Sequence, residues 1–220
     1  MKCKLITTAS DMSKTAMLQK SLIKFGWDYH IIEHEWTGFG NKLIQTYNYL
    51  KANPDITHFF YSDSYDTIVL DTMAEALSRV KDFDCILMSA ERACYPHPHK
   101  TPFYPALKDI NNPFKYVNGG GWFCNSQVFQ SIYKYNVPQE DTVDQVWFTD
   151  RFLSQTPLVK LDSDCNIFQT IAFCPDDNFE VYAKNILDPT IKIYNTITKT
   201  FPIFVHGNGH TPMDKFYKLI

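Results

Sequence analysis

The sequence predicts an α/β protein with a mostly parallel central β-sheet flanked by helices, and three observations support this class. Over the first ninety or so residues, apolar runs of strand length alternate with segments whose apolar side chains recur at helical spacing. This alternation favours right-handed crossovers, which place successive strands parallel to one another. With 45% hydrophobic and 15% aromatic residues among 220, the chain can fill the core of one large domain.

The elements of the first half each have a local reason. Ser10 or Asp11 can cap the first helix, and Gly26 can end it. Pro54 ends the second helix, which follows the loop "TGFG". In chain order we expect strand 3–9, helix 10–26, strand 28–36, helix 41–55, strand 56–63, helix 72–83 and strand 84–91. Ligands of such sheets bind at the carboxyl ends of the strands.

The second half begins with a long irregular segment. Residues 92–116 contain five of the twelve prolines, which predicts a loop over a site rather than a linker between domains. Beyond it we expect a helix at 142–155 and a strand-like segment at 200–210.

Charge, hydropathy and cysteine content limit the function classes. The chain has 21 Lys and Arg against 24 Asp and Glu and no long basic run, so charge-driven binding of nucleic acid is not indicated. The N-terminal apolar run is too short for a secretory signal, and no later run reaches the length of a membrane span. Six cysteines without a CxxC pair indicate a reducing compartment. We therefore expect a soluble intracellular protein.

Two carboxylates stand at the exit of the strand expected at 56–63. In "YSDSYDTIVL", Asp63 and Asp66 lie three residues apart, directly after the buried run "ITHFF". Hard oxygen ligands on one short turn suit Mg²⁺ or Mn²⁺ shared with a diphosphate. The alternative is that the two carboxylates only cap the turn and the following helix.

Histidine and glycine mark a second strand exit. His206 follows the apolar run "FPIFV" and begins "HGNGH", so its imidazole could join a metal while backbone amides approach phosphate. A local backbone hydrogen bond is the alternative role for this histidine. Seven of only eight glycines fall into three clusters, at 38–40, 119–121 and 207–209, which predicts close backbone approach at these loops.

Other motifs are weaker or absent. Cys94, His97 and His99 in "CYPHPH" resemble half of a zinc site, but no second half has matching spacing. Trp36 could stack on a planar base or fill the core. The usual dinucleotide, P-loop, esterase and zincin motifs do not occur.

Five ordered motifs resemble one known family. "YSDSYDTIVL", "YVNGGGWFCNSQVF", "DQVWFTDRFLS", "LDSDCNIFQT" and "HGNG" occur in this order in the glycosyltransferase domain of the collagen lysyl hydroxylases and, more distantly, in the collagen galactosyltransferases. The resemblance covers nearly the whole chain. It implies a GT-A fold with a Rossmann-like half, here a single domain at 1–220, with a nucleotide-binding half at about 1–91 and a sugar and acceptor half at about 92–220.

The resemblance also implies a cofactor, a donor and site residues. Mn²⁺, with Mg²⁺ as a substitute, would be held by Asp63, Asp66 and His206, and Asp144 and Gln145 would be catalytic. The UDP-sugar would be bound by Thr7, Thr8, Trp36, Lys42, Tyr65, Asn118, Gly119, Gly120, Asn208 and Gly209. The implied reaction transfers a hexose, glucose or galactose, to a hydroxyl acceptor, and the closer resemblance to retaining glucosyltransferases favours retention.

The sequence departs from the family around the sugar and acceptor. "EDTVDQ" replaces an acidic run, "NGGG" replaces "NSGG", and "CYPHP" stands where the family has a Trp-Pro loop. The acceptor therefore stays open between a hydroxyl of a protein, of a glycan or of a hydroxymethylated DNA base, and so does the oligomeric state. With no hydroxylase half or signal peptide expected, the interpretation is a cytoplasmic enzyme of a microbe, or of a host cell if viral. The alternative is a non-catalytic binding or scaffold domain that retains the fold.

Overall fold

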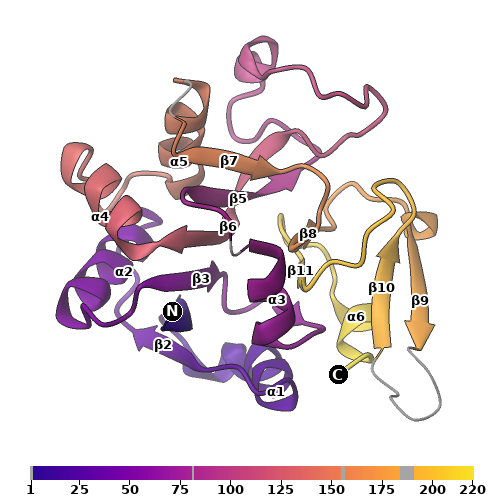
Figure 1. Ribbon diagram of the computed structural model, residues 1–220, viewed down its shortest axis with the longest axis horizontal. Coiled ribbons are helices and arrows are strands. Elements are labelled where there is room, and N and C mark those ends of the chain that lie inside the picture. Colours follow the sequence, from indigo (N-terminus) through magenta and orange to yellow (C-terminus); the bar gives the residue numbers. More distant parts are fainter. Residues whose placement is uncertain (1, 81, 155–156, 184–190) are drawn as a thin grey trace.

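A six-stranded sheet forms the centre of the computed structural model, which describes residues 2–80, 82–154, 157–183 and 191–220 (Figure 1). In spatial order the sheet contains β2 (Tyr29–Glu33), β1 (Cys3–Ala9), β3 (His58–Ser62), β6 (Tyr116–Asn125), β5 (Ile86–Glu91) and β7 (Val159–Asp162). β1 pairs in parallel with β2 and β3, and β5 pairs in parallel with β7. β6 runs antiparallel to both β3 and β5. The predicted α/β class with a mostly parallel sheet is confirmed.

A smaller sheet lies beside the central one. It contains β4 (Thr67–Val69), β11 (Phe204–His206) and β8 (Phe168–Thr170), in that order. β11 is antiparallel to β4 and parallel to β8, so the carboxyl ends of β8 and β11 lie together. The hairpin of β9 (Phe179–Ala183) and β10 (Ile191–Asn195) and the short helix α6 (Asp214–Tyr217) lie beyond it, at the right of Figure 1.

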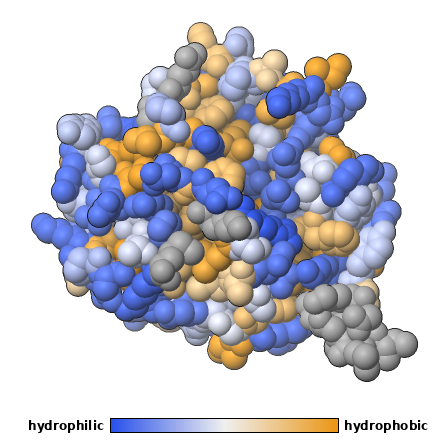
Figure 2. Space-filling view, in the orientation of Figure 1, coloured by the Kyte–Doolittle hydropathy of each residue, from blue (hydrophilic) through white to orange (hydrophobic). Residues whose placement is uncertain are grey.

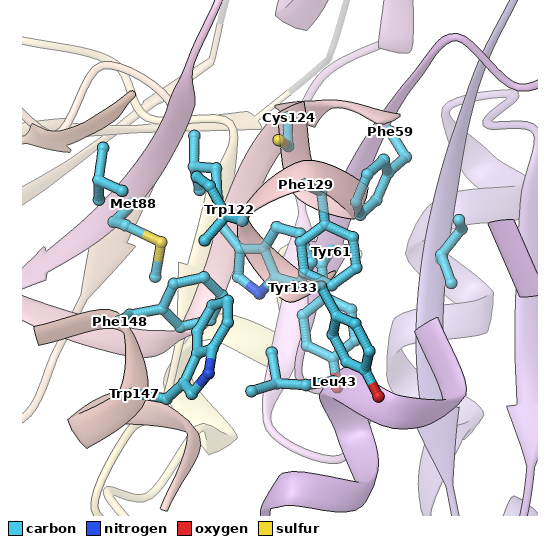
Figure 3. Packing of buried hydrophobic residues seen from close by; sticks show 14 of the residues in the cluster. Leu43, Phe59, Tyr61, Met88, Trp122, Cys124, Phe129, Tyr133, Trp147 and Phe148 are labelled. Carbon is cyan, nitrogen blue, oxygen red and sulfur yellow. The ribbon is translucent and has the colours of Figure 1, made fainter. Parts of the chain in front are cut away.

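Two apolar layers cover the central sheet, because side chains alternate between the faces of a strand. Phe59 and Tyr61 of β3 belong to one layer, and Phe60 belongs to the other. The first layer, part of which is seen in Figure 3, is completed by residues of α2 (Gly40–Ala52), α4 (Ser126–Tyr135) and α5 (Asp144–Leu153). The second includes residues of α1 (Ala16–Lys24), α3 (Met73–Val80) and the small sheet. Each fully buried aromatic side chain contributes about 1.5–3 kcal/mol by its removal from water.

The strand expected at 3–9 coincides with β1, and the other expected elements are present with shorter bounds. The helix expected at 10–26 begins as a 3-10 turn, η1 (Met12–Thr15), before α1, and the Asp11 side chain caps it by accepting a hydrogen bond from Ser13 N. The strand expected at 200–210 is reduced to the three residues of β11. Residue 81, in the helix expected at 72–83, and residue 155, at the end of the helix expected at 142–155, lie outside the described residues. The loop expected at 92–116 contains a 3-10 turn, η2 (Pro98–Phe103), and a second such turn, η3 (Asp176–Asn178), precedes β9.

The glycines of the loop "TGFG" serve packing between backbone segments. A Cβ atom at Gly38 would lie 2.2 Å from the carbonyl oxygen of Glu140, and one at Gly40 would lie 1.9 Å from that of Gln139. Gly40 N also donates a hydrogen bond to Glu140 O at 3.0 Å. The close approach predicted from the glycines is therefore made here to the segment that leads into α5, and it brings the starts of α2 and α5 together.

The surface is largely polar, with smaller groups of apolar residues between hydrophilic ones on the face in Figure 2. Among the described residues no helix combines the length and the apolar character that crossing a bilayer requires. All six cysteines lie in the described parts of the chain, and each is a free thiol.

Candidate functional site

Asp63, Asp66 and His206 cluster where the two sheets meet. Asp63 follows β3, Asp66 precedes β4, and His206 ends β11. The Nε2 atom of His206 lies 3.4 Å from Asp66 Oδ1 and 3.7 Å from Asp63 Oδ2, and the ligand atoms of all three residues lie within 4.8 Å of one another. Two backbone hydrogen bonds hold the turn, from Asp63 N to Gly120 O at 2.8 Å and from Gly207 N to Asp66 O at 2.7 Å.

The donor set of this cluster fits a divalent cation. Carboxylate oxygens suit Mg²⁺ and Mn²⁺, and an imidazole nitrogen is a common further ligand for a transition metal. In the described parts of the chain this is the group of three potential ligands that comes close enough to hold an ion. Cys94 and His97 make a different contact, a hydrogen bond from the thiol to the His97 carbonyl, so the weaker zinc interpretation gains no support.

Burial and neighbouring charges shift the pKa of each residue in the cluster. Burial alone would lower the pKa of His206, but the carboxylates of Asp66 and Asp63 outweigh it and raise that pKa above its ordinary value. Burial raises the pKa of Asp63, although Lys42 and His206 oppose this. The pKa of Asp66 is lowered, because the charge and hydrogen bond of His206 outweigh burial. The same negative field that draws a proton to His206 would attract a cation.

Gly120 leaves the space that this cluster needs. It belongs to a bulge in β6, where the pairing with β5 shifts register so that Met88 faces Trp122 while Ser89 faces Asn118. A Cβ atom at Gly120 would lie 2.1 Å from His206 Cε1 and 2.8 Å from Asp63 Oδ2. Only glycine therefore allows β6 to pass behind the cluster in this position.

Lys42 connects the cluster to Asp144. Its Nζ atom lies 2.7 Å from Asp63 Oδ1 and 3.2 Å from Asp144 Oδ2. The side chains of Lys42 and Asp144 are only 14% and 8% exposed. Burial would lower the pKa of Lys42, but the charges of Asp144 and Asp63 outweigh it and raise that pKa well above its ordinary value. The ammonium group is therefore charged and shared between two carboxylates.

Glu91 is a candidate site residue that sequence reasoning missed. It ends β5, is 5% exposed, and accepts hydrogen bonds from Gln145 Nε2 at 2.5 Å, Asn208 Nδ2 at 2.6 Å and Asn118 Nδ2 at 3.4 Å. Burial raises its pKa to about 7, although these three hydrogen bonds oppose the shift. The signal was an acid that ends the apolar strand "DCILMSAE", the same pattern that drew attention to Asp63.

The amide side chains around Glu91 position the neighbouring backbone. Gln145 Oε1 accepts a hydrogen bond from Gly119 N at 3.1 Å, and Asn208 Oδ1 accepts from the amides of residues 171 and 172. Asn118 Oδ1 accepts from Gly120 N and lies 3.2 Å from His206 Nδ1, which orients the imidazole ring. Gly209, the residue after Asn208, has a φ of +65°, in the left-handed region that favours glycine.

The residues expected to line the nucleotide divide into two groups. The hydroxyls of Thr7 and Thr8 are engaged inside the protein, with Ser62 O at 2.6 Å and Tyr61 Oη at 3.0 Å. Trp36 is 49% exposed and packs edge-on against Phe39, so the alternative that it fills the core is wrong. Tyr65 is 37% exposed, and its hydroxyl accepts hydrogen bonds from the backbone amides of residues 10 and 11. Both rings lie at the surface beside segments that lead into the site.

Most of the sequence-predicted residues thus form one connected network around the cluster, whereas Thr7, Thr8, Trp36 and Tyr65 make their contacts with other residues. Direct contacts join Asp63, Asp66, His206, Lys42, Asp144, Gln145, Asn118, Gly119, Gly120 and Asn208, with Glu91 at the centre of the amide side chains. The first acid of "LDSDCNIFQT" has a structural role instead, because Asp162 accepts hydrogen bonds from three backbone amides of residues 166–168.

This fold, together with the match to one family model, defines a glycosyltransferase-type domain. A solved structure described as "a glycosyltransferase involved in the glycosylation of the major capsid of PBCV-1" aligns over all of both chains with a TM-score of 0.57 at 9% identity, which establishes the shared fold, consistent with GT-A. The model of the family described as the PLOD GT domain matches residues 19–217. The chain belongs to this family, the glycosyltransferase domain of the procollagen lysyl hydroxylases.

Curated relatives agree with this assignment. An uncharacterized protein of Acanthamoeba polyphaga mimivirus is 28% identical over 83% of this chain and 38% of its own length. The procollagen-lysine,2-oxoglutarate 5-dioxygenase of Drosophila melanogaster is 30% identical over 80% of this chain and 24% of its own. The multifunctional procollagen lysine hydroxylase and glycosyltransferase of Homo sapiens is 28% identical over 71% of this chain and 21% of its own. The chain thus corresponds to well under half the length of these relatives.

Proposed function

We propose that this domain transfers a hexose, glucose or galactose, from a UDP-sugar to a hydroxyl acceptor, with Mn²⁺ or Mg²⁺ held by Asp63, Asp66 and His206. The observation that carries the proposal is the convergence of these three side chains, from the turn at 63–66 and from the end of β11, within a glycosyltransferase fold. A bound cation would neutralise the negative charge that develops on the departing diphosphate.

In this proposal the exposed aromatic residues bind the nucleotide. Trp36 and Tyr65 offer ring faces to the uracil, at the carboxyl ends of strands where such folds bind nucleotides. Thr7 and Thr8 shape the end of β1 beneath it through their internal hydrogen bonds. The backbone of Gly119, Gly120 and Gly209 would approach the diphosphate and sugar closely, because no Cβ atom shields it.

The sugar would be held by the polar network on the other side of the cluster. Asn118, Gln145 and Asn208 are oriented by their hydrogen bonds to Glu91, which leaves them little rotational freedom to lose when a sugar binds. The Asp144 carboxylate stands next to this network, where it would support developing positive charge on the sugar or position the incoming hydroxyl. We extend the proposal to retention of anomeric configuration, which NMR of the product would test directly.

The acceptor is proposed by chemistry alone, as a hydroxyl of a protein or glycan. The human relative is named as a procollagen lysine hydroxylase and glycosyltransferase, which supports a protein acceptor within this proposal. A hydroxymethylated DNA base is less well supported, because the net charge of −3 offers little attraction for phosphate. The mimivirus relative supports a viral or microbial source, in which the enzyme would act in the cytoplasm.

Release of UDP tests the proposal. UDP-glucose and UDP-galactose are incubated with the protein, with and without Mn²⁺, and the nucleotide product is measured. Asp63→Asn and Asp66→Asn should abolish Mn²⁺-dependent release without unfolding the protein, because each removes a ligand charge and little volume. Asp55→Asn is the matched control, since Asp55 is exposed and paired with Lys2 at the far end of β3. Equal release by all four proteins would overturn the metal assignment, and no release by any of them would favour a binding domain.

A further inference from the structure

We propose that Lys42 is an internal counter-ion that competes with the divalent cation for Asp63 and pairs with Asp144 when the cation binds. The inference rests on the proposed function only for the premise that Asp63, Asp66 and His206 hold a cation. It makes Lys42 a positioning residue, which couples the occupancy of the metal site to the start of α5.

The ammonium group of Lys42 lies between two carboxylates, those of Asp63 and Asp144. Its Nζ atom contacts Asp63 Oδ1 at 2.7 Å, while the other carboxylate oxygen of Asp63 faces His206. The same Nζ atom lies 3.2 Å from Asp144 Oδ2. The Phe39 ring, with its centroid 5.4 Å from this atom, packs near the ammonium group. An ammonium group has three donors and can exchange one carboxylate for the other without leaving this position.

Charge counting explains why the exchange should occur. Asp63, Asp66 and Asp144 carry three negative charges when ionised, and Lys42 leaves a net charge of −2 when His206 is neutral. A divalent cation brings this group to neutrality. Because the cation and the ammonium group would repel each other across Asp63, loading of the site weakens the pair of Lys42 with Asp63 and favours the pair with Asp144.

The packing of the two helices transmits this exchange. Lys42 lies in the first turn of α2 and Asp144 begins α5, and the Gly40 contact with Glu140 holds these helix starts together. Asp144 is followed by Gln145, whose side chain contacts Glu91 and Gly119. When a cation occupies the cluster of Asp63, Asp66 and His206, the stronger pair between Lys42 and Asp144 would thus order Gln145 and the residues it contacts, where the sugar is proposed to bind.

Two variants with opposite expected effects test the proposal. Binding of Mn²⁺ alone, without nucleotide, is measured by isothermal titration calorimetry and by the Mn²⁺-induced rise in melting temperature. Lys42→Met removes the competitor, so Mn²⁺ should bind at least about tenfold more tightly. Asp144→Asn leaves Lys42 paired with Asp63 alone, so Mn²⁺ should bind about tenfold more weakly although Asp144 is not a proposed ligand. Lys42→Arg keeps the charge and should stay close to the wild-type affinity.

The outcomes separate this inference from the proposed function. If Mn²⁺ binds to the wild type, is lost in Asp63→Asn and is unchanged or weaker in Lys42→Met, the counter-ion role is overturned while the metal site stands. If Lys42→Met does not fold, Asp144→Asn decides alone, because unchanged or tighter binding contradicts the exchange. If the wild type binds no Mn²⁺ by either measurement, the metal site fails and the inference falls with it.

Discussion

Replacing Gly120 with alanine should damage the metal site far more than the fold. The added Cβ atom would lie 2.1 Å from His206 Cε1, whereas ordinary contacts begin at 3.4 Å, so the ring or the strand must move by the difference of 1.3 Å. Metal ligands tolerate displacements of only about 0.2 Å. A displacement of about 1 Å in a catalytic group can cost about 100-fold in rate.

The expected result for Gly120→Ala is therefore a loss of about 10–100-fold in Mn²⁺ affinity, the range seen when the groups that orient metal ligands are changed. Mn²⁺ affinity is measured by calorimetry, UDP release by a coupled assay, and stability by urea unfolding. The second clash, 2.8 Å from Asp63 Oδ2, adds to the effect because it displaces another ligand of the same cluster.

Gly26→Ala is the matched control for Gly120→Ala. Gly26 has a φ of +65° with nothing within 4 Å of the added atom, so alanine there costs only its left-handed conformation, about 1–2 kcal/mol of stability. Mn²⁺ affinity in this control should equal that of the wild type. If Gly120→Ala also binds Mn²⁺ with wild-type affinity and releases UDP at the wild-type rate, the reasoning from close approach is refuted.

Three further predictions concern titration and the sugar side. His206→Ala should weaken Mn²⁺ and UDP binding together. Because ligation needs the neutral ring and the pKa of His206 is raised, the Mn²⁺ affinity of the wild type should begin to fall above pH 6.5 as the solution is acidified. A pH-independent affinity would contradict this. With Mn²⁺ at a concentration that saturates the variant, Asp144→Asn should reduce sugar transfer far more than UDP binding, and transfer at the wild-type rate would show that Asp144 takes no part in transfer. Because the pKa of Glu91 is raised from 4.5 in the unfolded chain to about 7 in the folded protein, the unfolded chain loses the proton first as pH rises. The protonated Glu91 therefore contributes its full stability below pH 4.5, and this contribution is lost as pH rises through about 7. Urea unfolding should therefore show the wild type losing up to about 3 kcal/mol relative to Glu91→Gln over that range, and parallel pH profiles would show that Glu91 is not perturbed.

The local sequence determined most of the elements and the metal candidates. Strand and helix periodicity, helix caps and proline stops depend on neighbours within a few residues, so the order of the first seven expected elements followed from the sequence. The strand at 3–9 has the expected bounds, the other spans proved too long, and β4 between β3 and α3 was not expected. The acids of "DSYD" and the histidine of "HGNGH" were found because polar ligands directly after apolar runs mark strand exits. β3 and β11 belong to different sheets, so the meeting of these exits was decided by how the two sheets pack.

Tertiary pairing decided what lies between those elements. β6 enters the sheet antiparallel between β3 and β5, so β5 keeps the direction of β3 but pairs with β6 and β7 instead of with β3. The run of glycines in β6 obscures its strand pattern. The need for glycine at 120 depends on His206, which lies far away in the sequence.

The contacts that give the site its chemistry also came only from the tertiary structure. The sequence shows Glu91 only as an acid at the end of a strand, and it became the centre of a polar network when Gln145 and Asn208 were folded onto it from other elements. Lys42 could be assigned to the nucleotide only by resemblance, whereas its position between Asp63 and Asp144 follows from the packing of α2 against the segment before α5. The sequence thus determined which ligand types stand at which strand ends, because that depends on local patterns. Which charges meet depends on contacts between residues separated by 21 to 143 positions, and only the packed structure decides those.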